Sequence, residues 1–425
     1  MAENKAIPTT NLFDLLRLLL SILSAYLRNP RAFKLIDPLD ACLRRGMAAY
    51  GPVFYIRVFR LKWLFVNDED FARRMLEPDP HSSGFTAGRT RRNAMDAMAP
   101  EALTALNDKP WRQMRDFNTA VLTPDQMPQG DARFLRSVET AFPAPVENFD
   151  AIKKGMGQVM LAVVFGEREA DEKLPVLIDQ LMDRVENPIR RRLCKRSIAE
   201  KRGALYDQLR AHWRMDPPAD ASLVSLGRRH AADAPECRHL DQIPHWMFTF
   251  VRSGSQWIAR SLALILSSPE AYRRCCDEAV KAWPEGGVDG AQTLDYIQAC
   301  MVETARLYPP VQWTFHQCPD GTDYEGGPIE AGTEILQVFT LWHRQRTGEI
   351  FKPENAMKQP DGYSVPDPLF LGGARYCPGR TLIQRLGAFT IARQLATHHL
   401  PQQAVVPMDD LPFAIRDERL VFSRT

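Results

Sequence analysis

The sequence predicts a mostly α fold with a small β region, and two observations support this prediction. Residues 110–282 show the spacing of apolar side chains that is typical of helices, interrupted by Pro and Gly. Beyond Pro309 the chain changes to short apolar runs separated by Gly and Pro, which is typical of strands and turns. Because no repeat, low-complexity tract or linker divides the chain, we expect an N-terminal extension over residues 1–30 and one domain over residues 31–425.

The first expected element is a leucine-rich helix over Leu12–Leu27. Asp14 and Arg17 interrupt it too early for a membrane span, which requires roughly 20 apolar residues. A single narrow polar stripe runs along this helix, formed by Asp14, Arg17, Ser21, Ser24 and Arg28. Three interpretations stay open: a helix docked on the protein body, a helix lying on a membrane surface, and a cleaved signal peptide.

Three further elements follow from local patterns. The β-branched and aromatic runs Val53–Phe59 and Lys62–Val66 predict a hairpin. Acidic and amide side chains within residues 67–70 can cap a helix that runs through Met75. A last helix is expected from about Arg380 to Thr397.

Composition narrows the class of function. The chain of 425 residues has 54 Lys and Arg against 52 Asp and Glu, and this balance gives no sign of a nucleic-acid partner. Its cysteines form no CxxC pair or zinc-like cluster, so we expect a reducing, cytoplasmic setting in which any cysteine chemistry belongs to one residue. The eight are Cys42, Cys194, Cys237, Cys275, Cys276, Cys300, Cys318 and Cys377.

One cysteine lies in a glycine-rich loop directly before the last expected helix. Residues 370–380 have the sequence Phe-Leu-Gly-Gly-Ala-Arg-Tyr-Cys-Pro-Gly-Arg, which fits F-x-x-G-x-R-x-C-x-G in full. Helix amides favour the anionic sulfur of Cys377, and Gly373 and Gly379 permit a tight turn and a close approach of backbone to a flat group. Arg375 lies two residues away and can pair with an acidic edge. An isolated cysteine here would be an ordinary buried thiol, but five matched positions favour a metal ligand.

This loop resembles the haem-binding loop of the cytochrome P-450 family. The resemblance extends over roughly residues 45–400 and implies a haem b, iron protoporphyrin IX, whose iron takes the Cys377 sulfur as axial ligand. It implies a mostly α cytochrome P-450 fold, with the haem between a long distal helix and the cysteine loop, and a single catalytic domain over residues 31–425. By the same match, the cofactor-binding residues of the loop are Phe370, Gly373, Arg375, Cys377 and Gly379.

A second family motif, E-x-x-R, matches Glu303 and Arg306. These side chains lie on one helix face, where they can form an ion pair. In this family the pair holds the core around the cysteine loop, often with a third arginine in a later P-E-R segment. Residues 351–355 are Phe-Lys-Pro-Glu-Asn, so that arginine is missing and the triad cannot form as in the family.

Two further residue sets resemble haem-propionate partners of the family. Trp111 and Arg115 match the W-x-x-x-R of a helix that holds one propionate, although an amphipathic surface helix would show the same spacing. His316 lies where family members often place another basic propionate partner. We therefore expect all three residues to bind the cofactor.

The expected helix over Ile243–Leu266 corresponds to the family's distal helix. In most monooxygenases of the family this helix carries an acid followed by an alcohol, which deliver protons to bound dioxygen. Counting back from the proline that follows the helix places Arg252 and Ser253 at these positions. Alignment on the Ser-Gly step places Gln256 and Trp257 there instead. Neither alignment supplies a carboxylate.

The candidate catalytic residues of this helix are therefore Arg252, Ser253 and Gln256. Without the acid, the protons are expected from ordered water, from Ser253 or Ser255, or from a group on the substrate. Arg252 is either a solvated residue or a bidentate anchor for a substrate carboxylate.

A run of basic residues over 190–196 lies where the family places its substrate-entry region. Its sequence is Arg-Arg-Arg-Leu-Cys-Lys-Arg. Such runs are usually solvated surface, and the alternative is contact with anionic lipid headgroups. Together with the leucine-rich helix, the alternative would give a peripheral membrane attachment.

The function expected from this resemblance is monooxygenation of a small apolar molecule with dioxygen and external electrons. The electrons would come from a ferredoxin with its reductase or from a flavoprotein reductase, and the enzyme would be a monomer. A peroxide-using, rearranging or dehydrating haem-thiolate enzyme is the alternative because the acid is missing. A haem protein that only binds or senses is a second alternative.

Overall fold

The structure, a computed structural model, describes residues 6–28, 36–58, 61–76, 85–123, 130–166, 171–186, 188–214, 222–231, 235–282, 294–357 and 368–422. It is mostly helical with a small β region, which confirms the fold class predicted from the sequence. The chain divides into two compact units, the sheet unit (Met1–Arg91, Val311–Glu349 and Val365–Tyr376) and the helical unit (Arg92–Pro310, Ile350–Ser364 and Cys377–Thr425). The single domain expected over residues 31–425 stays a prediction.

The sheet unit is built on a five-stranded sheet of order β1-β2-β7-β4-β3. All neighbouring strands are antiparallel except β2 and β7. The strands are β1 (Val53–Val58), β2 (Leu61–Val66), β3 (Thr86–Ala87), β4 (Trp313–Cys318) and β7 (Thr333–Val338), and β5 (Thr322–Tyr324) pairs with β6 (Gly327–Ile329). The helices of this unit are α1 (Leu12–Arg28), α2 (Ile36–Tyr50), α3 (Glu69–Met75), α17 (Phe339–Thr347) and the start of α4 (Arg89–Asp96).

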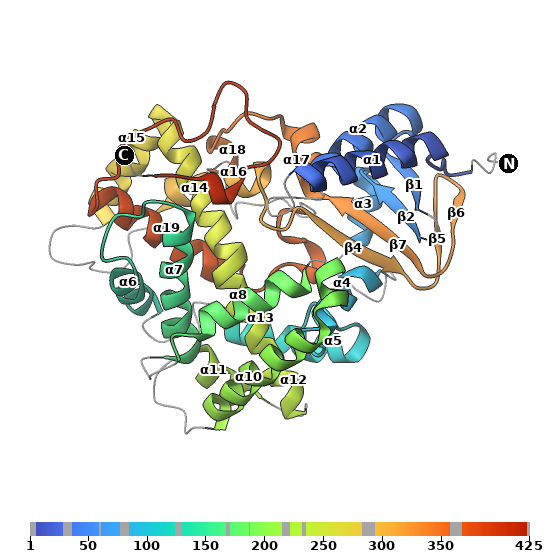
Figure 1. Cartoon of the computed structure of the whole chain (residues 1–425). Helices are drawn as coiled ribbons and strands as arrows, with labels where there is room; N and C mark the ends of the chain where they lie inside the picture. Colours follow the sequence, from blue (N-terminus) through green and yellow to red (C-terminus); the bar gives the residue numbers. More distant parts are fainter. Residues whose placement is uncertain are drawn as a thin grey trace. The chain divides into compact units, whose positions relative to one another are not determined.

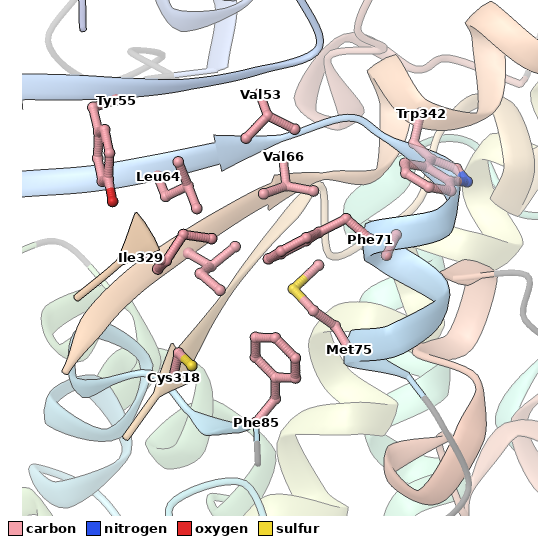
Figure 2. Close-up of a cluster of buried hydrophobic side chains, with 12 residues drawn as sticks. Val53, Tyr55, Leu64, Val66, Phe71, Met75, Phe85, Cys318, Ile329 and Trp342 are labelled. Carbon is pink, nitrogen blue, oxygen red and sulfur yellow. The ribbon is translucent and has the colours of Figure 1, made fainter. Parts of the chain in front are cut away.

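Alternating side chains of β1 and β2 give the sheet two buried faces. Val53, Leu64 and Val66 point to one face, where they pack with Phe71 and Met75 of α3 in the cluster that Figure 2 shows. On the other face, the Phe54 ring fills the space left by the missing side chain of Gly46 in α2. α2 therefore packs on β1, and α1 packs on α2 (Figure 1).

The helical unit contains the remaining helices. They are α5 (Asp108–Leu122), α6 (Gly130–Ala141), α7 (Phe149–Met160), α8 (Leu174–Val185), α9 (Pro188–Leu193), α10 (Lys195–Arg214), α11 (Leu223–His230), α12 (Glu236–Leu240), α13 (Gln242–Phe248), α14 (Ser255–Ser267), α15 (Pro269–Ala282), α16 (Asp295–Leu307), α18 (Glu354–Met357) and α19 (Arg380–Ala396). α14 is buried along its whole length except at Gln256 and packs against α7, α15, α16 and α19 (Figure 1). A helix that is buried on every side lies in the interior of the unit, and its buried polar side chains such as Arg260 need partners there.

The helix expected over Ile243–Leu266 is confirmed, and it contains a local change of helix type. A π-helical turn, Thr249–Gly254, separates α13 from α14. The Ser255 hydroxyl donates a hydrogen bond to the carbonyl of Phe250 at 3.0 Å, which satisfies one carbonyl of the widened turn. π-helical turns inside α-helices often mark functional sites, and this one contains two of the predicted catalytic residues.

The other expected elements agree closely with the structure. The hairpin forms as β1 and β2, although Phe59 and Arg60 at its turn lie outside the described residues. Asp68 caps α3 by accepting a hydrogen bond from the Phe71 amide at 2.9 Å, and the last helix ends at Ala396. Cysteines with described side chains are free thiols, and the Cys237 side chain lies outside the described part. Within that part, no helix is both long and apolar enough to cross a membrane.

Candidate functional site

The cysteine loop begins with an unusual backbone conformation. Leu371, Gly372 and Gly373 have φ values of 74°, 55° and 53°, which lie in the left-handed region. Glycine adopts this region at little cost, but a leucine there is strained. The turn Gly373–Arg375 follows, and the chain reaches Cys377 two residues later. Phe370 ends the preceding turn, Pro368–Phe370.

The Cys377 sulfur lies at the N-terminus of α19. Burial raises the pKa of this thiol, and the backbone amides of Gly379 and Arg380 and the guanidinium of Arg115 only partly offset that rise. Gly379 is the N-cap residue of α19, so the first amides of the helix point at the sulfur. A thiolate at this position would be stabilised by a further positive charge, such as that of a metal ion.

Trp111 and Arg115 are both buried on α5, one turn apart. The next turn of this helix is fixed to α13 through Asn118. Its side-chain oxygen accepts from the Trp246 indole at 2.7 Å, and its amide nitrogen donates to Gln242 at 3.0 Å. This network holds the guanidinium of Arg115 within electrostatic reach of the Cys377 sulfur.

His316 lies on β4 in the sheet unit and is almost fully buried. Burial, together with the charges of Arg91 and Arg375, lowers the pKa of His316 to about 3. The Gln337 side chain on β7 lies close enough to oppose this shift, but it is outside hydrogen-bonding geometry, so His316 Nε2 has no hydrogen-bond partner. A buried ring nitrogen without a partner, next to two guanidinium groups, suits an anionic ligand such as a carboxylate.

Arg252 of the π-helical turn is paired with three carboxylates of the α8 region. Its Nη2 lies 2.7 Å from Asp183 Oδ1 and 3.2 Å from Glu186 Oε2, and its Nε lies 3.6 Å from Asp179 Oδ1. Burial lowers the pKa of Arg252, but the three carboxylates outweigh it and the pKa is raised. The positive charge of the guanidinium is therefore already balanced by these carboxylates, and a substrate carboxylate would have to compete with them.

Gln256 and Trp257 are also engaged within the protein. The Gln256 amide donates to Asp417 Oδ2 at 3.1 Å, and the Trp257 indole donates to the carbonyl of Met301 on α16 at 2.6 Å. Ser253 is half-buried on the π-helical turn next to Gly254. A side chain at Gly254 would contact the carbonyl of Thr249 and the side chain of Ile383 on α19, so this turn lies against the helix that follows Cys377.

A buried ion pair that the sequence did not reveal fixes α14. Arg260 donates to Asp417 with distances of 2.7 Å and 2.8 Å, and both side chains are less than 5% exposed. Its remaining nitrogen donates to the carbonyls of Tyr308 and Pro309 at 3.0 Å and 3.1 Å. The pair thus joins α14, the end of α16 and the C-terminal segment.

A comparison with protein families indicates the class of protein. The model of the family described as Cytochrome P-450 matches residues 253–384, a range that includes Glu303, Arg306 and Cys377. This match, together with the relatives below, supports membership of the chain in the cytochrome P-450 superfamily.

Two curated relatives and one solved structure illustrate the similarity. Dimethylnonatriene synthase of Arabidopsis thaliana is 30% identical over 162 residues, which cover 35% of this chain and 31% of that protein. Cytochrome P-450 4A10 of Mus musculus is 27% identical over 165 residues, which cover 37% and 32%. The matched part thus spans about a third of these relatives. A retinoic acid-bound cyanobacterial CYP120A1 shares the fold, with a TM-score of 0.66, 18% identity and coverage of 83% of this chain and 86% of that one.

The two residues that match the E-x-x-R motif form a bidentate ion pair. Arg306 donates to both carboxylate oxygens of Glu303 at 2.7 Å and 2.8 Å. In place of the third arginine that the family often has, backbone groups bind this pair. The Lys352 amide donates to Glu303 at 2.8 Å, and Arg306 donates to the Ile350 carbonyl at 2.9 Å. Residues 350–352 are therefore held on α16 without the arginine.

The structure thus groups the predicted residues within each unit. The helical unit brings Arg115 to Cys377, and the sheet unit brings Arg375 to His316. Within the helical unit, the Arg252 side chain points toward the carboxylates of α8 rather than along its own helix. Sequence reasoning missed Asp417, Arg260 and the α8 carboxylates, since no local motif marks residues whose partners lie 66 to 157 positions away.

Proposed function

We propose that this chain is a haem-thiolate monooxygenase that binds haem b through Cys377 and oxidises a small, largely apolar molecule. The observation that carries this proposal is the Cys377 sulfur, which lies half-buried at the N-terminus of α19 with two backbone amides and the Arg115 guanidinium close enough to favour its anionic form. Such a sulfur has the surroundings of a thiolate ligand but lacks the full positive charge that a metal supplies.

Each unit by itself offers groups that fit a haem. In the helical unit, Trp111 and Arg115 provide a buried indole and guanidinium near the sulfur ligand. In the sheet unit, the half-buried guanidinium groups of Arg91 and Arg375 can pair with a propionate, and the buried, neutral His316 ring has an Nε2 atom without a hydrogen-bond partner. Phe370, Gly373 and Gly379 are proposed to contact the macrocycle through the family motif. When bound, the haem supplies the activation of dioxygen.

The residues of the π-helical turn determine how protons reach the distal side. The Ser255 hydroxyl is bonded to the Phe250 carbonyl, and Arg252 is compensated by α8. Gln256 is bonded to Asp417, so Ser253 carries the free hydroxyl of the candidate set. We therefore infer that Ser253, with ordered water, relays protons where other family members use an acid and an alcohol.

The electron donor is proposed to be a separate ferredoxin with its reductase or a flavoprotein reductase, and the enzyme is proposed to act as a monomer in the cytoplasm. A second candidate function follows from the distal turn. Because none of its described side chains is a carboxylate, a peroxide-using enzyme would also suit it. Hydrogen peroxide already carries the two electrons that the redox partner would otherwise supply and the two protons that the relay would otherwise deliver.

Spectroscopy of the purified protein tests the proposal. The reduced carbon monoxide complex should show the red-shifted Soret band of thiolate ligation, and Cys377→Ala should abolish it. Cys194→Ala is the matched control, because Cys194 is a free, half-buried thiol outside the loop, and it should leave the band unchanged. A wild-type band in Cys377→Ala would refute haem-thiolate ligation.

Turnover then separates the two candidate functions. Product formed with dioxygen, NADPH and a ferredoxin system, with Ser253→Ala diverting the electrons to free hydrogen peroxide, supports the monooxygenase. Product formed only with added hydrogen peroxide, and unaffected by Ser253→Ala, would establish the peroxide-using enzyme instead.

A further inference from the structure

The outward face of α1 is apolar. Five large side chains of this helix are exposed: Phe13 by 75%, Leu16 by 48%, Leu20 by 65%, Leu23 by 53% and Leu27 by 68%. They are spaced three and four residues apart, so they fall within an arc of about 80° on the helix surface. We call these five residues the α1 stripe.

The opposite face of α1 is fixed to the sheet unit. Leu18 lies across the helix from the α1 stripe and is 5% exposed. Asp14 accepts a hydrogen bond from Tyr50 of α2 at 2.9 Å, and Asn11 donates to the same hydroxyl at 3.1 Å. The helix is therefore docked on the protein body, as one interpretation of the sequence expected, and it cannot rotate to hide the stripe.

This orientation is the reverse of that of an ordinary surface helix. A helix docked by one face should direct its polar residues to water. Here Arg17 and Ser21 lie beside the stripe, and leucines occupy the outermost position. The stripe presents roughly 500 Å² of apolar surface, near the upper end of the patches found on monomeric soluble proteins. An exposed apolar surface of this size usually marks a site that binds another protein or a membrane.

Area and charge favour lipid over a second copy of the chain. Two stripes packed together would bury roughly 1,000 Å² in total, below the about 1,200 Å² at which stable, specific interfaces begin. In a pair of packed helices, the residues on either side of the apolar seam often form ion pairs between the two helices. In α1 these residues include Arg17, Leu19 and Ser24, and none of the three is an acid that could pair with Arg17 of a second copy. Arg17 is an exposed cation, which suits anionic headgroups.

We propose that the α1 stripe binds the surface of a lipid bilayer, with α1 lying in the headgroup region and Arg17 contacting anionic lipids. Attachment is peripheral, because the face of α1 opposite the stripe stays packed on α2. This inference is independent of the proposed catalytic function.

Flotation of the haem-loaded full chain with mixed phosphatidylcholine and phosphatidylglycerol vesicles tests the proposal. Leu16→Gln, Leu20→Gln and Leu23→Gln combined should lower the lipid–water partition coefficient by at least about tenfold, because three leucines no longer leave water. Arg17→Gln should lower it by about fivefold, and only on vesicles that contain the anionic lipid.

The matched control replaces three valine and isoleucine side chains that are at least as exposed but lie outside α1. Val176→Gln, Val280→Gln and Ile350→Gln, at sites 56%, 57% and 77% exposed, should leave partitioning unchanged. A loss of vesicle binding in this control as large as in the α1 variant would overturn the proposal.

Two further results would also contradict it. One is a wild-type protein that is dimeric without lipid and becomes monomeric in the α1 variant, which would assign the stripe to a second copy. The other is a lowered thermal midpoint in the α1 variant, since the stripe would then be covered by the protein itself. An unchanged midpoint and an unchanged haem spectrum are expected.

Discussion

The buried pair between Arg260 and Asp417 offers the sharpest test of how the distal helix is held. We consider Asp417→Asn, which keeps the shape of the side chain and removes its charge. The guanidinium of Arg260 is 3% exposed, so it would stay charged without a counter-ion in a low-dielectric interior. Removal of one partner from such a pair typically costs about 3–5 kcal/mol. Because an asparagine oxygen can still accept one hydrogen bond, we expect a loss of about 3 kcal/mol in the free energy of unfolding.

Urea unfolding followed by circular dichroism and tryptophan fluorescence measures this loss. The transition midpoint should fall with little change in its slope, because the area exposed on unfolding is unaltered. Glu200→Gln removes one partner of the Arg196–Glu200 pair, whose side chains are 94% and 63% exposed, and should leave the midpoint unchanged. If Asp417→Asn lowers the free energy of unfolding no more than this control does, the Arg260–Asp417 pair does not stabilise the position of α14.

Three further predictions concern the cysteine loop, the sheet unit and the distal turn. Leu371→Asn should raise the free energy of unfolding by about 1 kcal/mol in urea titrations, because asparagine tolerates the left-handed conformation that strains leucine. The pKa of His316 is lowered from 6.5 to about 3, so the unfolded chain binds a proton that the folded chain does not. The contribution of His316 to the free energy of unfolding is therefore fully present above pH 6.5 and decreases as the pH is lowered. In the haem-free protein the loss should reach about 2 kcal/mol at pH 5, and His316→Gln should remove this pH dependence. Arg252→Gln should lower stability by about 1–2 kcal/mol, because three carboxylates lose their cation, and should not change the ratio of affinities for carboxylic and neutral ligands in spectral titrations.

Each of these predictions has a result that would contradict it. A lowered stability of Leu371→Asn would mean that the leucine side chain contributes more by packing than its backbone strain costs. An unchanged pH profile in His316→Gln would show that other groups cause the acid sensitivity. A selective loss of affinity for carboxylic ligands in Arg252→Gln would show that the arginine leaves α8 to bind substrate.

The elements that the sequence predicted well are those with local signals. The alternating residues of β1 and β2, the Asp68 cap of α3 and the helix that begins at Arg380 each depend on neighbours within a few positions. The Glu303–Arg306 pair is of the same kind, because residues three apart share one helix face. The widened turn at Thr249–Gly254 had no such signal, since it depends on side chains packed around α14.

The residue chemistry of the cysteine loop was determined by the sequence alone, because the motif around Cys377 fixes residue types at fixed spacing. Tertiary structure decided what the other charged groups do. Arg252 pairs with Asp183, 69 positions away, and Arg260 pairs with Asp417, 157 positions away. Tertiary structure also decided that the leucines of the α1 stripe face outward, since the buried side of a helix depends on what packs against it. Periodicity describes the faces of a helix, and only the packing of distant segments assigns each face to protein, cofactor or solvent.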